Sequence, residues 1–201
     1  MKVEIAKSYP MPCTADVAWE FLQDIESVAG CMPGAKITER LAANRYKGTV
    51  TVKVGPATMS FRGEVEMKEV DPAARTLRLL GKGTDSTGSS GASMNLSARV
   101  EPAEVDRSTL VGTSEVSMSG KAAAFGGRMM NTVADQILKQ FADNFAARVG
   151  AIQAQRSAPV ATAKGAALPT PPPAATELNG LALAWAIFRD WLRGLFGKNT
   201  A

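Results

Sequence analysis

The strongest constraint on the fold is a series of segments in which apolar and polar residues alternate one by one. Residues 45–56 read RYKGTVTVKVGP, and the pattern recurs in 57–72, 75–83, 91–102 and 108–120. In the first two segments, the apolar side collects Tyr46, Gly48, Val50, Val52, Val54, Met59, Phe61, Val65 and Met67. A period of two is typical of strands. It favours antiparallel strands with one face covered and the other in water.

Helical patterns flank these strands. Residues 2–10 alternate as a first strand, and 14–24 then begin with Thr and carry apolar residues at helical spacing. A second short helix is expected in 24–31, ended by the Pro and Gly of MPGA. In 122–152, the apolar stripe of a long helix is formed by Met130, Ala134, Ile137, Leu138, Phe141 and Phe145. This order of elements predicts an α+β domain over residues 1–152.

The rest of the chain has a different composition. The stretch 153–176 reads QAQRSAPVATAKGAALPTPPPAAT and buries too little apolar surface to offset the entropy of ordering. We therefore expect a disordered, flexible linker there, followed by a separate segment, 177–201. Residues 1–10 lack the apolar core of a signal peptide, which predicts a cytoplasmic protein.

The residue types weigh against several classes of function. The chain contains no His, so Ser–His and Cys–His nucleophile pairs are impossible within it. Its two cysteines, Cys13 and Cys31, form neither a zinc-binding nor a disulfide pattern. The net charge of +4 comes from cations scattered among acids, which argues against a nucleic-acid partner. A binding protein is favoured over an enzyme, and no catalytic or metal-binding residues are assigned.

Five short motifs add a resemblance to a known family. CMPGA at 31–35, YKGTVTVKVGP at 46–56, FRGEVE at 61–66, GKGTDSTGSSGA at 81–92 and SGKAAAFGGRMM at 119–130 are similar to motifs of the carbon monoxide dehydrogenase G-subunit family. The resemblance implies the START-like (SRPBCC, helix-grip) fold. In that fold a curved antiparallel sheet wraps around a long C-terminal helix, two short helices accompany it, and an apolar cavity lies between sheet and helix.

The resemblance also implies a function. Proteins of this family accompany aerobic molybdenum-containing carbon monoxide dehydrogenases and related hydroxylases. The implied role is a non-catalytic accessory protein that recruits the dehydrogenase to the inner face of the cytoplasmic membrane. Its cavity would hold the electron acceptor, a respiratory quinone (menaquinone or ubiquinone). The molybdenum, flavin and iron–sulfur groups belong to the partner, because two cysteines are too few to ligate a cluster.

Two other functions stay open. One is a lipid carrier that has no dehydrogenase partner. The other is an enzyme similar to the polyketide aromatases and cyclases, which share the START-like fold. Such an enzyme would need polar acid/base groups inside its cavity. In this sequence only Tyr46 and Asn95 come near the inward side of the strands, which argues against it.

The inward side of the strands and of the long helix forms the candidate ligand-binding set. None of its side chains is charged, and its methionines adapt to irregular apolar shapes, which suits an isoprenoid or acyl chain. The set comprises Val50, Val52, Met59, Phe61, Val65, Met67, Met94, Leu96, Val116, Met118, Phe125, Met129, Met130, Val133 and Ile137. The same residues would also suit a solid core, so both interpretations stay open.

The segment 177–201 contains a further amphipathic pattern. A helix over 181–196 would be about 24 Å long, shorter than the roughly 30 Å hydrocarbon core of a bilayer, so it should not span a membrane. Its apolar face collects Leu181, Trp185, Phe188, Trp191, Leu192, Leu195 and Phe196. Aromatic residues on one side and arginines on the other predict a helix that lies in the membrane interface. There are two alternatives: the helix docks into a groove of a partner protein, or it docks onto the chain's own domain.

Three smaller features have two interpretations each. Residues 81–92 place Asp85 among glycines and hydroxyls, but they lack the Lys-Ser/Thr ending of a phosphate loop, so a strand connection is favoured. FGGR at 125–128 is either a hinge over the cavity mouth or a place of close backbone packing. Cys31 is expected to be a small buried residue rather than a reactive thiol.

Overall fold

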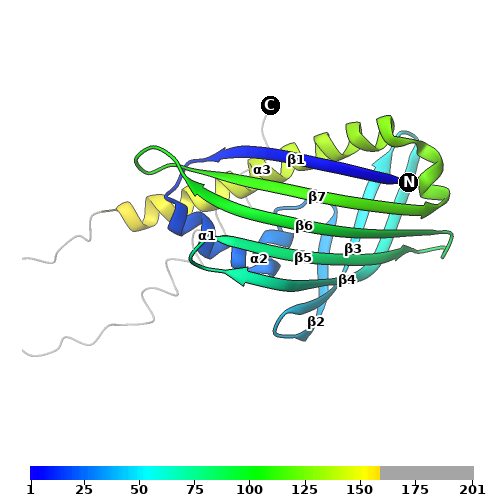
Figure 1. Ribbon diagram of the computed structural model, residues 1–201, viewed down its shortest axis with the longest axis horizontal. Coiled ribbons are helices and arrows are strands. Elements are labelled where there is room, and N and C mark those ends of the chain that lie inside the picture. The colour runs from blue at the N-terminus through cyan, green and yellow to red at the C-terminus, as the bar shows by residue number, and fades with distance from the viewer. Residues whose placement is uncertain (159–201) are drawn as a thin grey trace, which may run out of the picture. The chain divides into compact units, whose positions relative to one another are not determined.

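The computed structural model describes residues 1–158 (Figure 1). Most of the predicted linker and all of the predicted helix in 177–201 lie outside the described residues. In chain order, the elements are β1 (Lys2–Met11), α1 (Ala15–Gln23), α2 (Ile25–Ala29), β2 (Ala35–Ala42), β3 (Arg45–Val54), β4 (Ala57–Asp71), β5 (Thr76–Asp85), β6 (Ser90–Pro102), β7 (Ser108–Gly120), the 3-10 helix η1 (Lys121–Phe125) and α3 (Gly127–Ser157).

The strands form one antiparallel seven-stranded sheet in the order β1-β7-β6-β5-β4-β3-β2. Every strand predicted from alternation is present. Figure 1 shows β3 and β2 running steeply across the direction of the other strands, so the sheet bends around α3. The predicted α+β arrangement of a curved sheet, two short helices and a long C-terminal helix is confirmed.

Strand β2 is not predicted by the alternation. Its sequence, AKITERLA, contains two large apolar residues, Ile37 and Leu41, and register shifts lie between Ile37 and Glu39 and between Arg40 and Ala42. A bulge sets two residues opposite one, which destroys the period of two. Because β2 is an edge strand, its bulges and charged side chains also hinder pairing with other chains.

Helices α1 and α2 both begin at side-chain caps. Thr14 Oγ1 accepts a hydrogen bond from Val17 N at 3.4 Å, and Asp24 Oδ1 accepts one from Ser27 N at 3.1 Å. Each cap satisfies a backbone N–H that has no partner within the first turn. The Thr and Asp at these starts are therefore the local signals that place both helices.

The C-terminal helix differs from the predicted one at both ends. Gly126, with φ +76°, separates η1 from α3, so 122–152 is not one continuous helix. At the other end α3 continues to Ser157, so residues 153–157, predicted as the start of the linker, are helical. Gln153 holds this extension in place, since its Oε1 accepts a hydrogen bond from Thr14 N at 3.3 Å and its Nε2 donates one to Asp106 Oδ1 at 3.4 Å.

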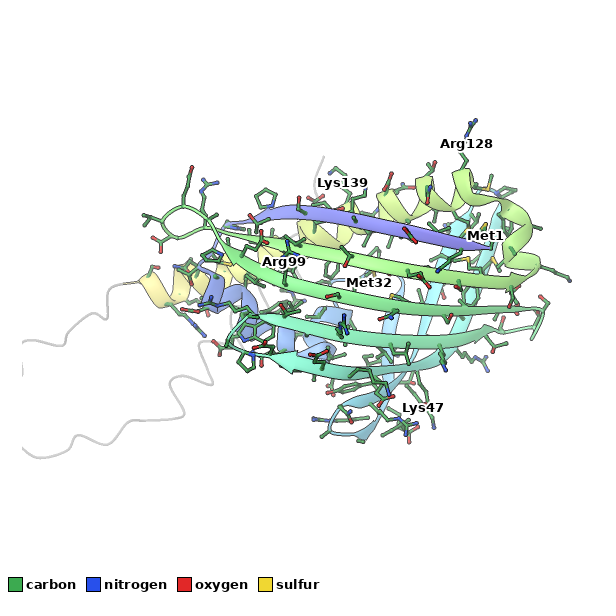
Figure 2. The ribbon with its side chains drawn as sticks, in the orientation of Figure 1. Met1, Met32, Lys47, Arg99, Arg128 and Lys139 are labelled. Atoms are coloured by element: carbon green, nitrogen blue, oxygen red, sulfur yellow. The ribbon has the colours of Figure 1, made fainter. Side chains whose placement is uncertain are left out.

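The two sides of α3 have opposite surroundings. Figure 2 shows Arg128 and Lys139 pointing away from the sheet. On the other side of the helix, Phe145 and Val149 are fully buried. Lys7 Nζ of β1 and Asp135 Oδ1 of α3 form an ion pair at 2.9 Å that links the helix to the edge of the sheet. The amphipathic stripe read from the sequence thus packs on the concave face.

Candidate ligand-binding face

The strand register places all of the predicted strand residues on the concave face of the sheet. Directly opposed residues of antiparallel strands project to the same side. The opposed pairs are Tyr46 and Val65, Val50 and Phe61, Val52 and Met59, Met67 and Leu79, Leu79 and Leu96, Met94 and Val116, and Ala92 and Met118. The predicted strand register is therefore confirmed, and the binding role of these residues stays a prediction.

These residues do not all pack into a core. One apolar cluster is built around α1, α2 and the C-terminal half of α3, and Val65, Met67 and Leu96 pack against it. A second, small cluster contains buried Met130, with Val52, Met118, Phe125 and Val133 packed against it. The remaining predicted residues belong to neither cluster: Val50, Met59, Phe61, Met94, Val116, Met129 and Ile137. We call these seven the open patch.

The open patch consists of apolar side chains that the fold leaves partly uncovered. Val50 is 39% exposed and Met129 42% exposed, and the others have intermediate burial. In a solid core, side chains of this size would touch neighbours on all sides. The packed clusters fit the solid-core interpretation, and the partly exposed patch is where a ligand would bind, which stays a prediction.

A row of very small residues crosses the concave face beside the patch. Gly48, Gly63, Gly83 and Ala92 are opposed in turn on β3, β4, β5 and β6. At Gly63 an added Cβ would lie 2.0 Å from the Lys82 carbonyl oxygen, so the neighbouring backbone itself requires glycine. These four residues carry nothing larger than a methyl group, which leaves room above the sheet along this row.

The polar residues considered for acid/base chemistry are unsuitable for it. Tyr46 is buried, and its hydroxyl donates to the backbone carbonyl of Ala43 at 3.3 Å. Asn95 is opposed to Leu80 and Glu115 on the convex face and is exposed. Neither side chain therefore offers a proton-transfer group to the concave face.

Ser114 is a polar residue of the concave face that the sequence prediction misses. It is opposed to Ile5 and Leu96, and its Oγ is buried without a hydrogen-bond partner. The signal was present in the alternation of β7, where Leu110, Gly112, Ser114, Val116 and Met118 share one side. A prediction that includes only the apolar residues of that side leaves Ser114 out, although it lies in line with them.

Residues 81–92 are a strand connection, as favoured from the sequence: they comprise the end of β5, the turn 86–89 and the start of β6. Asp85 Oδ1 accepts a hydrogen bond from Ser90 N at 2.6 Å, and Asp85 Oδ2 accepts one from Thr87 Oγ1 at 2.5 Å. The hydrogen bond from the Thr87 side chain is the main reason that the pKa of Asp85 is lowered. The carboxylate thus closes the turn between β5 and β6.

Both cysteines are structural. Cys31 is 1% exposed and Cys13 fully buried, and burial raises the pKa of both thiols. A raised pKa lowers the thiolate fraction and with it the reactivity. The interpretation of Cys31 as a small buried residue is confirmed. Within residues 1–158, no three His, Cys, Asp or Glu side chains are grouped so that they could hold a metal ion.

The two glycines of FGGR do not serve close packing. An added Cβ at Gly126 or Gly127 would have no atom within 4 Å, so the close-packing interpretation is wrong. Gly126 instead supplies a backbone conformation with positive φ that residues with side chains rarely adopt. It allows the chain to turn from η1 into α3 beside Phe125.

Two surface depressions lie elsewhere. One, of about 420 Å³, lies between α2 and β2 and is lined by Glu26, Gly30 and residues 35–40. The other, of about 740 Å³, lies over β4 to β7 and is lined mainly by convex-face residues such as Arg62, Lys82 and Ser117. Of the predicted lining residues, only Met118 borders either depression. Neither one is the predicted apolar cavity.

Among the helices of residues 1–158, none combines the length and the hydropathy needed to cross a bilayer. The predicted membrane-binding residues, Leu181 to Phe196, lie outside the described part of the chain.

Several solved structures share this fold. A conserved protein from Geobacillus kaustophilus superposes with a TM-score of 0.66 at 20% identity, covering 75% of this chain and 96% of its own. The ZhuI aromatase/cyclase of a Streptomyces species superposes with a TM-score of 0.56 at 17% identity, covering 79% of this chain and 99% of its own. A START superfamily protein from Mycobacterium smegmatis superposes with a TM-score of 0.53 at 15% identity, covering 74% of this chain and 98% of its own. At these identities the likeness shows the START-like fold alone.

Sequence comparison with protein families is more specific. None of the curated proteins compared with this sequence matches it. The model of one family, the carbon monoxide dehydrogenase G subunit (CoxG), matches residues 10–150, which include β3 to β7 and most of α3. The matched region contains the open patch and all five motifs that carry the resemblance. The chain therefore belongs to the CoxG family of carbon monoxide dehydrogenase, and its described domain has the START-like fold.

Proposed function

We propose that this protein is a non-catalytic accessory protein that holds a respiratory quinone on its concave face. The observation that carries the proposal is the open patch: uncharged, partly exposed side chains between two packed clusters. Covering such a surface with an apolar molecule is favourable, at about 25 cal/mol per Å² removed from water. Sugars and phosphates find no charged or hydrogen-bonding partners among these seven side chains.

The proposed partner is an aerobic molybdenum-containing carbon monoxide dehydrogenase or a related hydroxylase. Family membership supports this partner, since the family is described as a subunit of carbon monoxide dehydrogenase. The proposed second role is recruitment of the dehydrogenase to the cytoplasmic membrane. It is supported by the aromatic and cationic residues of 177–201, which suit the membrane interface. Electrons leaving the dehydrogenase would then reach a quinone held close to the bilayer.

Mass spectrometry of the extracted ligand tests the quinone proposal. Full-length protein is purified from a quinone-producing bacterium, extracted with organic solvent and analysed for bound lipid. We expect a quinone in near-stoichiometric amount. Met94→Trp combined with Phe61→Trp, both in the open patch, should fill it and abolish co-purification in a folded protein. Phospholipid alone in the extract would favour a lipid carrier, and an empty extract would refute ligand binding.

A further inference from the structure

One buried polar atom of the concave face has no hydrogen bond. Within residues 1–158, Ser114 Oγ is the only buried side-chain nitrogen or oxygen without a partner. Other buried hydroxyls are satisfied: Ser90 Oγ accepts from Ala122 N at 3.0 Å, and Ser108 Oγ lies 3.9 Å from Cys13 Sγ. Because an unpaired buried hydroxyl destabilises a fold, its presence beside the apolar residues of the open patch calls for a reason.

The position of Ser114 in the fold suggests a reason for the unpaired hydroxyl. Its partner Leu96 on β6 packs against the large cluster, and its partner Ile5 on β1 packs against the small one. Val116 lies two residues further along β7, opposite Met94 of β6, and both belong to the open patch. Ser114 therefore stands where the open patch ends and the packed clusters meet.

The exposure of the side chains differs between the two ends of the open patch. Val50 and Met129 are its most exposed members, whereas Ser114 Oγ is covered. A long apolar molecule that enters past the exposed residues would bring its leading end to Ser114. Met94 lies diagonally across β6 and β7 from Ser114, and its methyl end lies over Gly81 of β5, on the side of β6 away from β7.

We propose that Ser114 is the hydrogen-bond partner of the polar end of the bound molecule, a carbonyl or hydroxyl oxygen on an otherwise apolar ligand. This assignment rests on the proposed function of the concave face. A serine hydroxyl donates to a quinone carbonyl and accepts from a quinol hydroxyl. The same residue therefore suits the oxidised and the reduced form of the ligand.

A pair of matched probes tests the assignment in full-length protein freed of lipid. Menadione carries two carbonyl groups on a naphthalene frame, and trimethylnaphthalene has methyl groups in their place. By calorimetry, we expect Ser114→Ala to weaken menadione binding roughly threefold to tenfold and to leave trimethylnaphthalene unchanged. Ser114→Thr keeps the hydroxyl and should keep the affinity. Ser117→Ala, on the same strand but opposed to Ser93 on the convex face, is the control and should change neither.

The failures are distinguishable. If Ser114→Ala binds both probes like the wild type and melts at a higher temperature, Ser114 is only an unpaired buried hydroxyl and the assignment is wrong. If the wild-type protein binds neither probe, the proposed function fails and the assignment fails with it.

Discussion

Two phenylalanines on facing elements offer the sharpest test of whether the concave face is open. Phe145 of α3 is fully buried, and its ring packs edge-on against Phe21 with centroids 5.0 Å apart. Replacing it with Ala removes a buried ring and leaves a cavity, which should cost about 3–5 kcal/mol. Phe61 of β4 belongs to the open patch and is only partly buried. Its replacement by Ala should cost about 1 kcal/mol, since roughly half of the transfer energy is lost and no new cavity forms.

Urea denaturation of delipidated full-length protein, followed by circular dichroism, measures both costs. With a slope of about 2 kcal/mol per molar urea, Phe145→Ala should lower the midpoint by roughly 1.5–2.5 M and Phe61→Ala by about 0.5 M. Lipid must be removed first, because a bound ligand would stabilise the native state and blur the comparison. Equal losses of about 3 kcal/mol or more for both variants would mean that Phe61 is part of a solid core. The open patch would then not exist.

Three further experiments test the turn before α3, the acid sensitivity and the predicted membrane-binding segment. Gly126→Ala forces a side chain into a conformation with positive φ and should lower the free energy of unfolding by about 1–3 kcal/mol. Gly127→Ala should instead stabilise the fold by about 0.4–1 kcal/mol. Thermal denaturation that shows the reverse order would contradict the backbone assignment. The lowered pKa of Asp85 means that its ionised form stabilises the fold above its ordinary pKa of about 4, and that this contribution is lost as pH falls through the lower folded value. Asp85→Asn should therefore melt earlier than wild type at pH 7, and the gap should close as pH falls below the folded pKa of Asp85; a gap independent of pH would refute the charge argument. Trp185→Ala with Trp191→Ala should abolish co-sedimentation with liposomes at low and high salt while ligand binding persists; unchanged sedimentation would place the anchor elsewhere.

Much of the fold follows from the sequence because its signals are local. The period of two in β3 to β7 needs only neighbouring residues, and so do the caps at Thr14 and Asp24. Where the local signal is broken, prediction fails. The bulges of β2 hide its alternation, and the end of α3 depends on Gln153 reaching Thr14, a contact between residues far apart in the chain.

The site divides in the same way. Alternation by itself determined which side chains face inward, and the absence of charge among the collected ones is the reason that we propose an apolar ligand. Only the tertiary structure decided which inward residues are packed and which are left uncovered, because packing depends on where α1, α2 and α3 lie over the sheet. The same holds for Ser114. The alternation of β7 shows that this serine faces inward, but its hydroxyl is buried and unpaired only because β7 lies between β1 and β6. Local patterns determine the direction of a side chain, whereas its neighbours come from parts of the chain that the pattern does not contain.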